Sequence, residues 1–123
     1  MPGVPEILRR LRSAYDVSGA VVMDRHGRIV RASVPESVNL PALAVMVSSM
    51  FEAATNIGEE FNKPPPRRIE VTTPNGSVVI AAAGPEHLLT VILSTWDARA
   101  FVPLVEQAAN DLHESLQAAV VRG

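Results

Sequence analysis

The sequence lacks cysteine, a net positive charge and long apolar runs, and each absence excludes a class of function. Without cysteine there is no disulfide framework and no thiolate to ligate a metal or act as a nucleophile. A net charge of −2 is not the strong positive charge with which nucleic-acid-binding proteins neutralise phosphates, so we expect no nucleic-acid partner. The first residues lack the apolar core of a secretion signal, and no run approaches the roughly 20 apolar residues that span a bilayer. We therefore expect cytoplasmic localisation and no membrane partner.

The composition is that of a folded globular protein. Of the 123 residues, 47% are hydrophobic and 20% are charged, which predicts a single domain over residues 1–123 and not a disordered chain. The charges are unevenly distributed. Residues 1–34 contain six Arg and three acidic residues, whereas residues 35–123 contain five basic and ten acidic residues, so the two stretches carry +3 and −5. Such asymmetry can orient a partner, and a solvated face explains it equally well.

Hydrophobic spacing and turn residues divide the chain into three helices and five strands. We predict a short helix after Pro5, a long helix that begins near Leu40 and ends by Asn62 or Lys63, and a last helix that begins near Pro103. The predicted strands cover residues 18–24 and 28–34, joined by a turn at Gly27, and residues 68–73, 78–83 and 88–94. A five-stranded antiparallel sheet with helices on its faces would bury all three helical stripes. The predicted fold class is therefore α+β, in the order α-β-β-α-β-β-β-α.

The long helix has two faces of interest. We predict that its core-facing stripe consists of Leu43, Met46, Val47, Met50, Ala54, Ile57 and Phe61, which recur at three and four residues. A neighbouring face carries mostly small side chains, namely Ala42, Val45, Ser49, Ala53 and Asn56, alongside Glu52. Small side chains permit close approach by another helix or a partner protein, although a plain solvent-exposed face is the alternative interpretation.

No group of residues predicts catalysis, a metal site or a cofactor. The three histidines, His26, His87 and His113, are far apart in sequence, and no glycine-rich loop could hold phosphates. The pair Glu59-Glu60 lies off the apolar stripe and is expected to be solvated. Arg67-Arg68 could bind an anion or could protect an edge strand, and Trp96 could anchor an interface or close the end of the sheet. We predict that the chain is not an enzyme.

Three segments resemble the Roadblock family, which includes dynein light chains and many bacterial and archaeal GTPase regulators. They are VSGAVVMDRHGRIVRAS in the first hairpin, the Ala/Ser-rich helix from Leu40, and RRIEVTTPNGSVVIAAAGPEHLLTVILS in the last three strands. Together with the element order they extend the resemblance over about residues 4–121. The family shares related sheets with profilin-like, longin and PAS-type domains, so the resemblance implies a Roadblock/profilin-like fold.

The resemblance also implies partners. It implies a homodimer, or a heterodimer with a related Roadblock protein, in which the third strands pair edge to edge and the second helices pack together. The dimer edge that this implies consists of Arg68, Ile69, Glu70, Val71 and Thr72. It further implies a non-catalytic scaffold that binds and regulates a Ras-like small GTPase without donating an arginine finger. We assign the GTPase, preferentially in its GTP state, to the outer face of the long helix: Val45, Ser49, Glu52, Ala53 and Asn56.

Two alternative functions stay open at this point. A profilin-like or PAS-like sensory domain would require a ligand cavity lined by polar groups, and the strand patterns instead predict a dry core. An assembly adaptor without a GTPase would use the same surfaces. The sequence does not name the GTPase, the pathway or the direction of regulation.

Overall fold

Three α-helices, one short 3-10 helix and five strands make up the part of the chain, residues 2–122, that this computed structural model describes. In chain order they are α1 (Val4–Ser13), β1 (Val17–Asp24), β2 (Ile29–Ser33), α2 (Leu40–Glu60), β3 (Arg68–Thr73), β4 (Gly76–Ala83), β5 (His87–Leu93), η1 (Ala98–Phe101) and α3 (Val102–Arg122). Each predicted strand is present with its ends within two residues of the prediction. The sequence did not predict η1.

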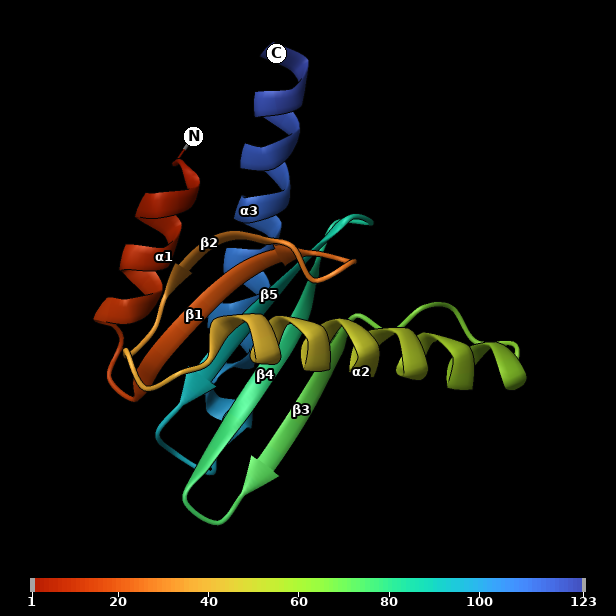
Figure 1. The fold of residues 1–123 in the computed structure, drawn as a ribbon, viewed down its shortest axis with the longest axis horizontal. Helices are drawn as coiled ribbons and strands as arrows, with labels where there is room; N and C mark the ends of the chain where they lie inside the picture. Colours follow the sequence, from red (N-terminus) through yellow and green to blue (C-terminus); the bar gives the residue numbers. More distant parts are fainter. Residues whose placement is uncertain (1, 123) are drawn as a thin grey trace.

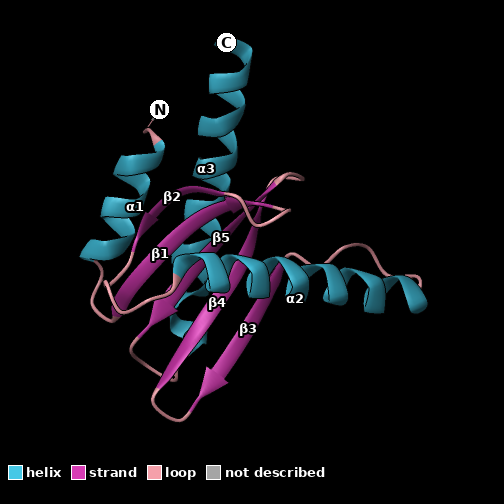
Figure 2. Ribbon diagram, viewed as in Figure 1, coloured by secondary structure: helices cyan, strands magenta, loops and turns pink. Residues whose placement is uncertain are grey.

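The five strands form one antiparallel sheet in the order β2-β1-β5-β4-β3. Helices α1 and α3 cover one face of the sheet, and α2 crosses the other face, where its buried side chains share a core with residues of β1, β4 and β5 (Figures 1 and 2). The predicted α+β fold class and element order are confirmed. Because β2 and β3 are the first and last strands of the order, each has a free edge in the single chain.

Alternation along the central strands creates two separate apolar cores. In β1, Ala20 and Val22 belong to the core beneath α1 and α3, whereas Val21 and Met23 belong to the core beneath α2. Within the described residues, the buried polar side chains are those of Ser77 and Thr90. Both faces of the sheet are therefore filled with apolar side chains, in keeping with the predicted dry core.

The predicted core stripe of α2 is wrong in its orientation. The structure buries Ala44, Val47 and Phe51 against the sheet, whereas four residues of the predicted stripe are exposed: Met46, Met50, Ile57 and Phe61. At about 100° per residue these two sets occupy adjoining sides of the helix, and both sides are apolar. Spacing alone therefore could not tell which apolar side packs on the chain's own sheet.

The other two helices also carry exposed apolar side chains at or near their ends. In α3, Leu104 and Val120 are 37% and 77% exposed, while Val105 and Ala109 are buried. Helix α1 ends at Ser13, and Tyr15, just beyond it, is 88% exposed.

Helix α2 is 21 residues long and, by length and composition only, apolar enough to cross a membrane. The sequence has no continuous run of roughly 20 apolar residues, and α2 passes by its average composition although it contains Ser, Thr, Asn and Glu side chains. This is weak support for a membrane span, since a helix that packs on a protein core passes the same test. The two adjoining apolar sides of α2 account for its composition, because one side packs on the sheet and the other is exposed.

Candidate functional site

The start and end of α2 are set by local chemistry. The Asn39 side chain caps the first turn by accepting the Ala42 N–H at 3.1 Å, and Pro41 occupies a position that needs no intrahelical donor. At the other end Asn62 adopts φ +56°, and the prolines at 64–66 cannot continue the helix. These signals let α2 run beyond the sheet before the chain turns back to β3, as Figure 1 shows.

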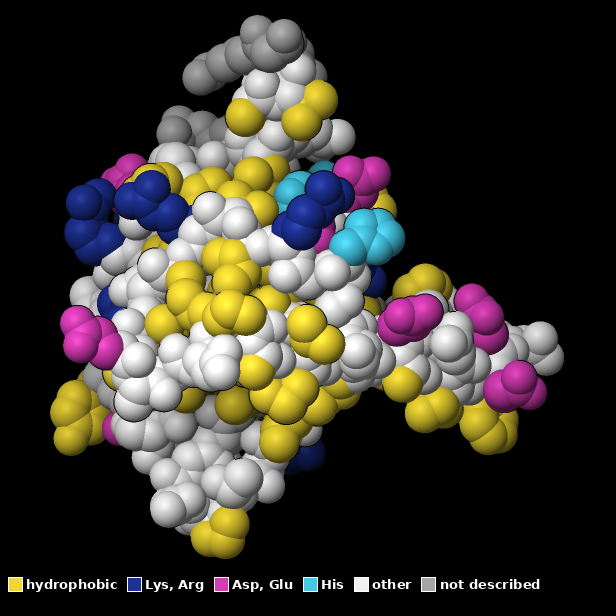
Figure 3. Space-filling model, viewed as in Figure 1, with side chains coloured by type: hydrophobic (Ala, Val, Ile, Leu, Met, Phe, Trp, Pro, Cys, Tyr) yellow, Lys and Arg dark blue, Asp and Glu magenta, His cyan; other side chains and the backbone are white. Residues whose placement is uncertain are grey.

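An exposed apolar stripe follows one side of α2 and continues to Phe61, just past the end of the helix. It consists of Met46, Met50, Ile57 and Phe61, which are 58%, 40%, 62% and 70% exposed. Hydrophobic side chains follow the lower side of the projecting helix in the view of Figure 3, and acidic side chains lie above them. Large apolar side chains gathered on one side of a helix are typical of a protein or membrane interaction site.

The five residues assigned to the partner-binding face all lie at the surface on an adjoining side of α2. Val45 is 62% exposed, and Ser49, Glu52, Ala53 and Asn56 are also exposed. The structure keeps them together on one helical face, next to the apolar stripe. Their spacing was sufficient to predict this arrangement, because all five belong to one continuous helix.

Glu52 and Asn56 also border a surface hollow of about 280 Å³ that the sequence did not predict. Its far side is formed by Arg25, whose guanidinium carbon lies 4.7 Å from the centre of the Phe51 ring and whose Nη2 donates to the Gly84 carbonyl at 3.2 Å. Burial lowers the pKa of Arg25 below its ordinary value. An arginine in a hairpin turn gives no sequence signal of this role, because its position over α2 depends on tertiary packing.

The β1–β2 turn anchors this side of α2. Asp24 accepts the backbone N–H groups of His26 at 2.8 Å and Arg28 at 3.0 Å, and its second oxygen accepts Arg28 Nε at 2.8 Å. Burial acts to raise the pKa of Asp24, but these donors outweigh it and hold the pKa below the ordinary 3.8. Ser48 Oγ on α2 donates to the Arg25 carbonyl at 2.6 Å, so the turn and the helix are joined directly.

The predicted dimer edge is the free edge of β3. Ala82 N–H donates to the Arg67 carbonyl at 2.9 Å, and antiparallel hydrogen bonding alternates along the strand. The N–H and C=O groups of Arg68, Glu70 and Thr72 therefore point away from β4. The side chains of Ile69 and Val71 are half-buried on the α2 side of the sheet. An outside strand could pair with β3 without disturbing its ladder to β4.

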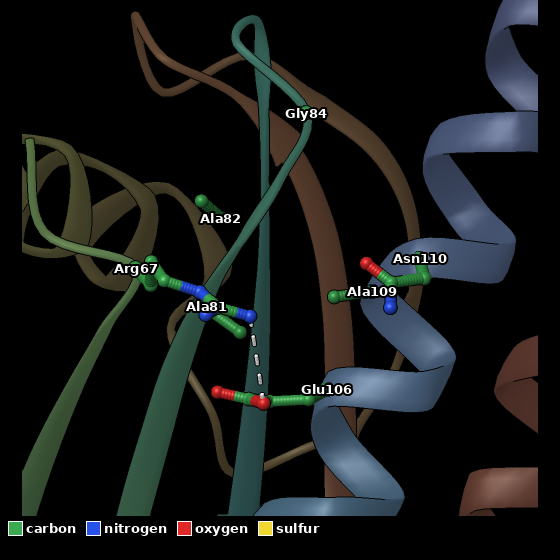
Figure 4. A pocket seen from close by; sticks show the side chains of 7 residues that line it. All are labelled: Arg67, Ala81, Ala82, Gly84, Glu106, Ala109 and Asn110. Carbon is green, nitrogen blue, oxygen red and sulfur yellow. Dashed lines mark ion pairs between the residues drawn. The ribbon is translucent and has the colours of Figure 1, made fainter.

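Glu106 of α3 contacts both members of the arginine pair that precedes and begins β3. Arg68 Nη1 lies 2.5 Å from Glu106 Oε1 and Arg68 Nε lies 3.0 Å from Glu70 Oε2. Hydrogen bonds to Glu70 and then to Glu106 raise the pKa of Arg68. Arg67 Nη2 reaches Glu106 Oε2 at 3.8 Å across a hollow of about 200 Å³ (Figure 4). Because both arginines already face carboxylates, the structure argues against an anion site at this pair.

The histidines and Trp96 are the remaining candidates from the sequence. His26 is exposed in its turn, while His87 and His113 border one hollow of about 250 Å³, a proximity that the sequence had left open. Among the described residues, no three His, Cys, Asp or Glu side chains are grouped as metal ligands. Trp96 follows β5 and is 62% exposed, so it does not belong to the core.

Comparison with known proteins identifies similar domains. The family model of the Roadblock/LC7 domain matches residues 4–93. No curated protein sequence matches the chain. The solved structure "MglB with tetrameric arrangement" is 19% identical, with a TM-score of 0.84, and the match covers 97% of this chain and 95% of that chain. MglB of Myxococcus xanthus is 14% identical, with a TM-score of 0.84, and the match covers 95% of this chain and 99% of that chain. A Roadblock/LC7 domain of Streptomyces avermitilis is 13% identical, with a TM-score of 0.83, and the match covers 94% of this chain and 99% of that chain. At these identities the structural matches establish the fold alone.

Proposed function

Because the chain belongs to the Roadblock/LC7 family, we propose that it is a cytoplasmic, non-catalytic dimeric scaffold that binds and regulates a Ras-like small GTPase. The observation that carries the proposal is the exposed surface of α2. After Phe51 no residue of α2 is buried, yet Ile57 and, just past the end of the helix, Phe61 are large apolar side chains that are 62% and 70% exposed. A second protein that covers this surface would remove a large apolar area from water.

The dimer is proposed to use the β3 edge and the apolar stripe of α2 together. Ile69 of β3 and Val78 of β4 pack against the core beneath α2, so the helix and the free edge belong to one side of the domain. Pairing two β3 strands around a two-fold axis would satisfy the outward groups of Arg68, Glu70 and Thr72. The same rotation would bring two α2 helices together. One symmetric contact would thus cover both exposed features.

The GTPase is proposed to dock on the adjoining face of α2. Ser49 and Ala53 are small enough to let a GTPase's switch segments approach the helix backbone, and Glu52 and Asn56 offer polar contacts beside them. Switch segments are ordered by the γ-phosphate of GTP, so a protein that grips them gains affinity for one nucleotide state. We therefore expect a preference for the GTP-bound GTPase.

The proposal assigns no catalysis to the chain itself. It has no phosphate-binding glycine loop, and the described residues contain no cluster of potential metal ligands. We expect purified protein to hydrolyse neither ATP nor GTP without a partner. Regulation would then act through the GTPase's own residues.

A binding assay with purified candidate Ras-like GTPases tests the function. The full chain is immobilised, and each GTPase is presented with GDP or with a non-hydrolysable GTP analogue. We expect capture of a cognate GTPase in the GTP-analogue state. Ser49→Arg or Ala53→Arg should weaken capture by a few kcal/mol, roughly a hundredfold, through clash and desolvation. Gln117→Arg on α3 is the matched control, because it adds the same charge to another exposed helix position.

The possible outcomes separate the proposed surfaces. Normal capture by the Ser49→Arg and Ala53→Arg dimers, with equal binding of both nucleotide states, would contradict the docking face. Loss of the dimer in these variants would instead identify the face as the homodimer seam and move the GTPase elsewhere. Failure to capture any Ras-like GTPase in either state would overturn the function and leave an assembly adaptor.

A further inference from the structure

A groove runs between α1 and the edge strand β2, at the opposite edge of the sheet from β3. It has a volume of about 350 Å³ and is lined by Pro5, Leu8, Arg9 and Arg12 of α1 and by Arg31, Ala32 and Ser33 of β2. The four helix residues are spaced by three and four positions, so they share one helical face. Three of the seven lining residues are arginines, and none is acidic.

The arginines of residues 1–34 differ in how their charges are compensated. Arg10 lies 3.1 Å from Glu6, and Arg28 lies 2.8 Å from Asp24. Arg25 stacks on Phe51. The remaining three are those that line the groove, Arg9, Arg12 and Arg31, and within residues 2–120 none of them lies within 4.0 Å of a carboxylate. The positive charge of the N-terminal stretch is thus concentrated, unneutralised, in one groove.

One of these guanidinium groups is held in place before any ligand arrives. Arg12 Nη1 donates to the Ser33 carbonyl at 2.7 Å and to Ser33 Oγ at 3.0 Å. Its Nε is buried and has no hydrogen-bond partner in the described part of the chain. A fixed guanidinium loses little side-chain entropy when it binds an anion, so the site is partly preorganised. Arg9 and Arg31 are exposed on either side of it.

We infer that this groove binds a phosphate group. Three guanidinium groups require more than one negative charge for neutralisation. A phosphomonoester carries about −1.5 to −2 at pH 7, and a pyrophosphate carries more, on one compact group. An extended peptide fits less well, because β2 is bulged at Val30, where Val22 pairs with Arg31 and Met23 pairs with Ile29, and because Arg12 occupies the Ser33 carbonyl. Both features interrupt the edge to which another strand would pair.

The site is separate from the surfaces of the proposed function. β2 and β3 are at opposite ends of the strand order, and Figure 3 shows Lys and Arg side chains gathered over α1 and β2, away from the apolar side of α2. A dimer through β3 would leave both grooves open. The scaffold could therefore bind a phosphate ligand independently of its protein partners.

Titration of inorganic pyrophosphate into the full chain by isothermal calorimetry tests the inference. We expect Arg9→Gln and Arg31→Gln each to weaken binding roughly tenfold, because each removes one charge-assisted contact. Arg10→Gln is the matched control, since it removes the same charge from the same helix outside the groove and should leave binding unchanged. All three side chains are exposed, so thermal melting should show folded variants. Absence of pyrophosphate binding, or an equal loss in Arg10→Gln, would overturn the inference.

Vesicle co-sedimentation distinguishes the two sources of such a phosphate. Vesicles of phosphatidylcholine with phosphatidic acid present a phosphomonoester on a membrane, and phosphatidylcholine vesicles are the control. Binding to the phosphatidic acid vesicles that Arg31→Gln abolishes would support a lipid headgroup. Binding of pyrophosphate without vesicle binding would support a soluble phosphate compound, which is the result we expect from a chain of net charge −2.

Discussion

The two edge strands of the sheet, β2 and β3, differ in whether another strand could pair with them. β2 is five residues long, bulged, flanked by α1, and has its last carbonyl occupied by Arg12. β3 pairs with β4 over six residues in unbroken register, and the backbone groups of Arg68, Glu70 and Thr72 point outward. A bulged and occupied edge discourages further pairing, whereas a straight open edge is a template for it. The difference favours the proposed protein pairing at β3 and leaves β2 free for other chemistry.

The surfaces beside the two edges follow the same division. The groove beside β2 is lined by three arginines, whereas α2, on the side of β3, carries a stripe of large exposed apolar side chains. Covering an apolar stripe with another protein is favourable by about 25 cal/mol for each Å² removed from water. A basic groove is stabilised when an anion binds in it. Each edge thus has a neighbouring surface suited to the partner that the edge itself permits.

The largest expected effect on the dimer comes from removing a backbone hydrogen-bond donor from the free edge of β3. Thr72→Pro removes an N–H that points away from β4 and should leave the β3–β4 ladder intact. Because a symmetric dimer uses this group in both copies, we expect a loss of about 3 kcal/mol, roughly a hundredfold in the dimer dissociation constant. Thr72→Ala, which keeps the N–H, is the control. Sedimentation equilibrium measures both. Equal dissociation constants for the two variants would exclude β3 pairing.

A smaller effect is expected at the apolar stripe of α2. Ile57→Glu places a charge where the proposed seam buries an apolar side chain, and should weaken the dimer by about 2 kcal/mol, roughly thirtyfold. Asn56→Glu introduces the same side chain one residue earlier, on the adjoining face, and should leave the dimer intact. Sedimentation equilibrium again provides the comparison. A dimer that tolerates Ile57→Glu would place the seam elsewhere.

Changes near β2 should affect folding stability and not assembly. Asp24→Ala removes the acceptor for two backbone N–H groups and for Arg28, and should lower the free energy of unfolding by about 2 kcal/mol at neutral pH. The folded-state pKa of Asp24 is lowered, so its contribution is present above pH 3.8 and is lost as the pH falls through the folded-state pKa. Urea unfolding of both proteins between pH 7 and pH 3, roughly the range in which such carboxyls titrate, measures this.

The control for that prediction is Asp24→Asn. Its amide oxygen can still accept the two backbone N–H groups, so it should lose less stability than Asp24→Ala. The dimer dissociation constant should be the same in both variants as in the unmodified chain. A stability difference that persisted unchanged to low pH would show that the Asp24 charge contributes nothing.

The smallest effects are expected in the ion pairs behind β3. Arg68 is about one-third exposed and contacts Glu70 and Glu106, so Arg68→Gln should cost about 1 kcal/mol of folding stability. Arg67 is 83% exposed and lies 3.8 Å from Glu106, so Arg67→Gln should change stability by less than about 0.5 kcal/mol. Thermal unfolding in low and high salt compares them. A larger loss in Arg67→Gln would contradict the geometry.

Local signals were enough to predict the elements and their order. Asn39, the prolines at 64–66 and the turn at Asn75-Gly76 act within a few residues of the helix and strand ends that they determine, so the sequence contains them directly. The residues of the partner-binding face were also kept together, because they share one helix. Their role as a binding surface stays a prediction.

Features that depend on tertiary packing could not be predicted in the same way. The core side of α2 was misplaced because Met46, Met50 and Ile57 are as apolar as the residues that face the sheet. Nothing in the sequence distinguishes a helix face that meets its own sheet from one that meets a partner. The groove beside β2 was missed because Arg9, Arg12 and Arg31 come together only when α1 packs beside the strand.

The mass of the purified chain in solution, measured by static light scattering over a range of concentrations, tests the central claim of a dimeric scaffold most directly. The open β3 edge and the apolar stripe of α2 predict a mass of roughly twice 13.2 kDa that falls toward 13.2 kDa only on strong dilution. A concentration-independent mass of 13.2 kDa would contradict the account, because both surfaces would then stay exposed in the working protein.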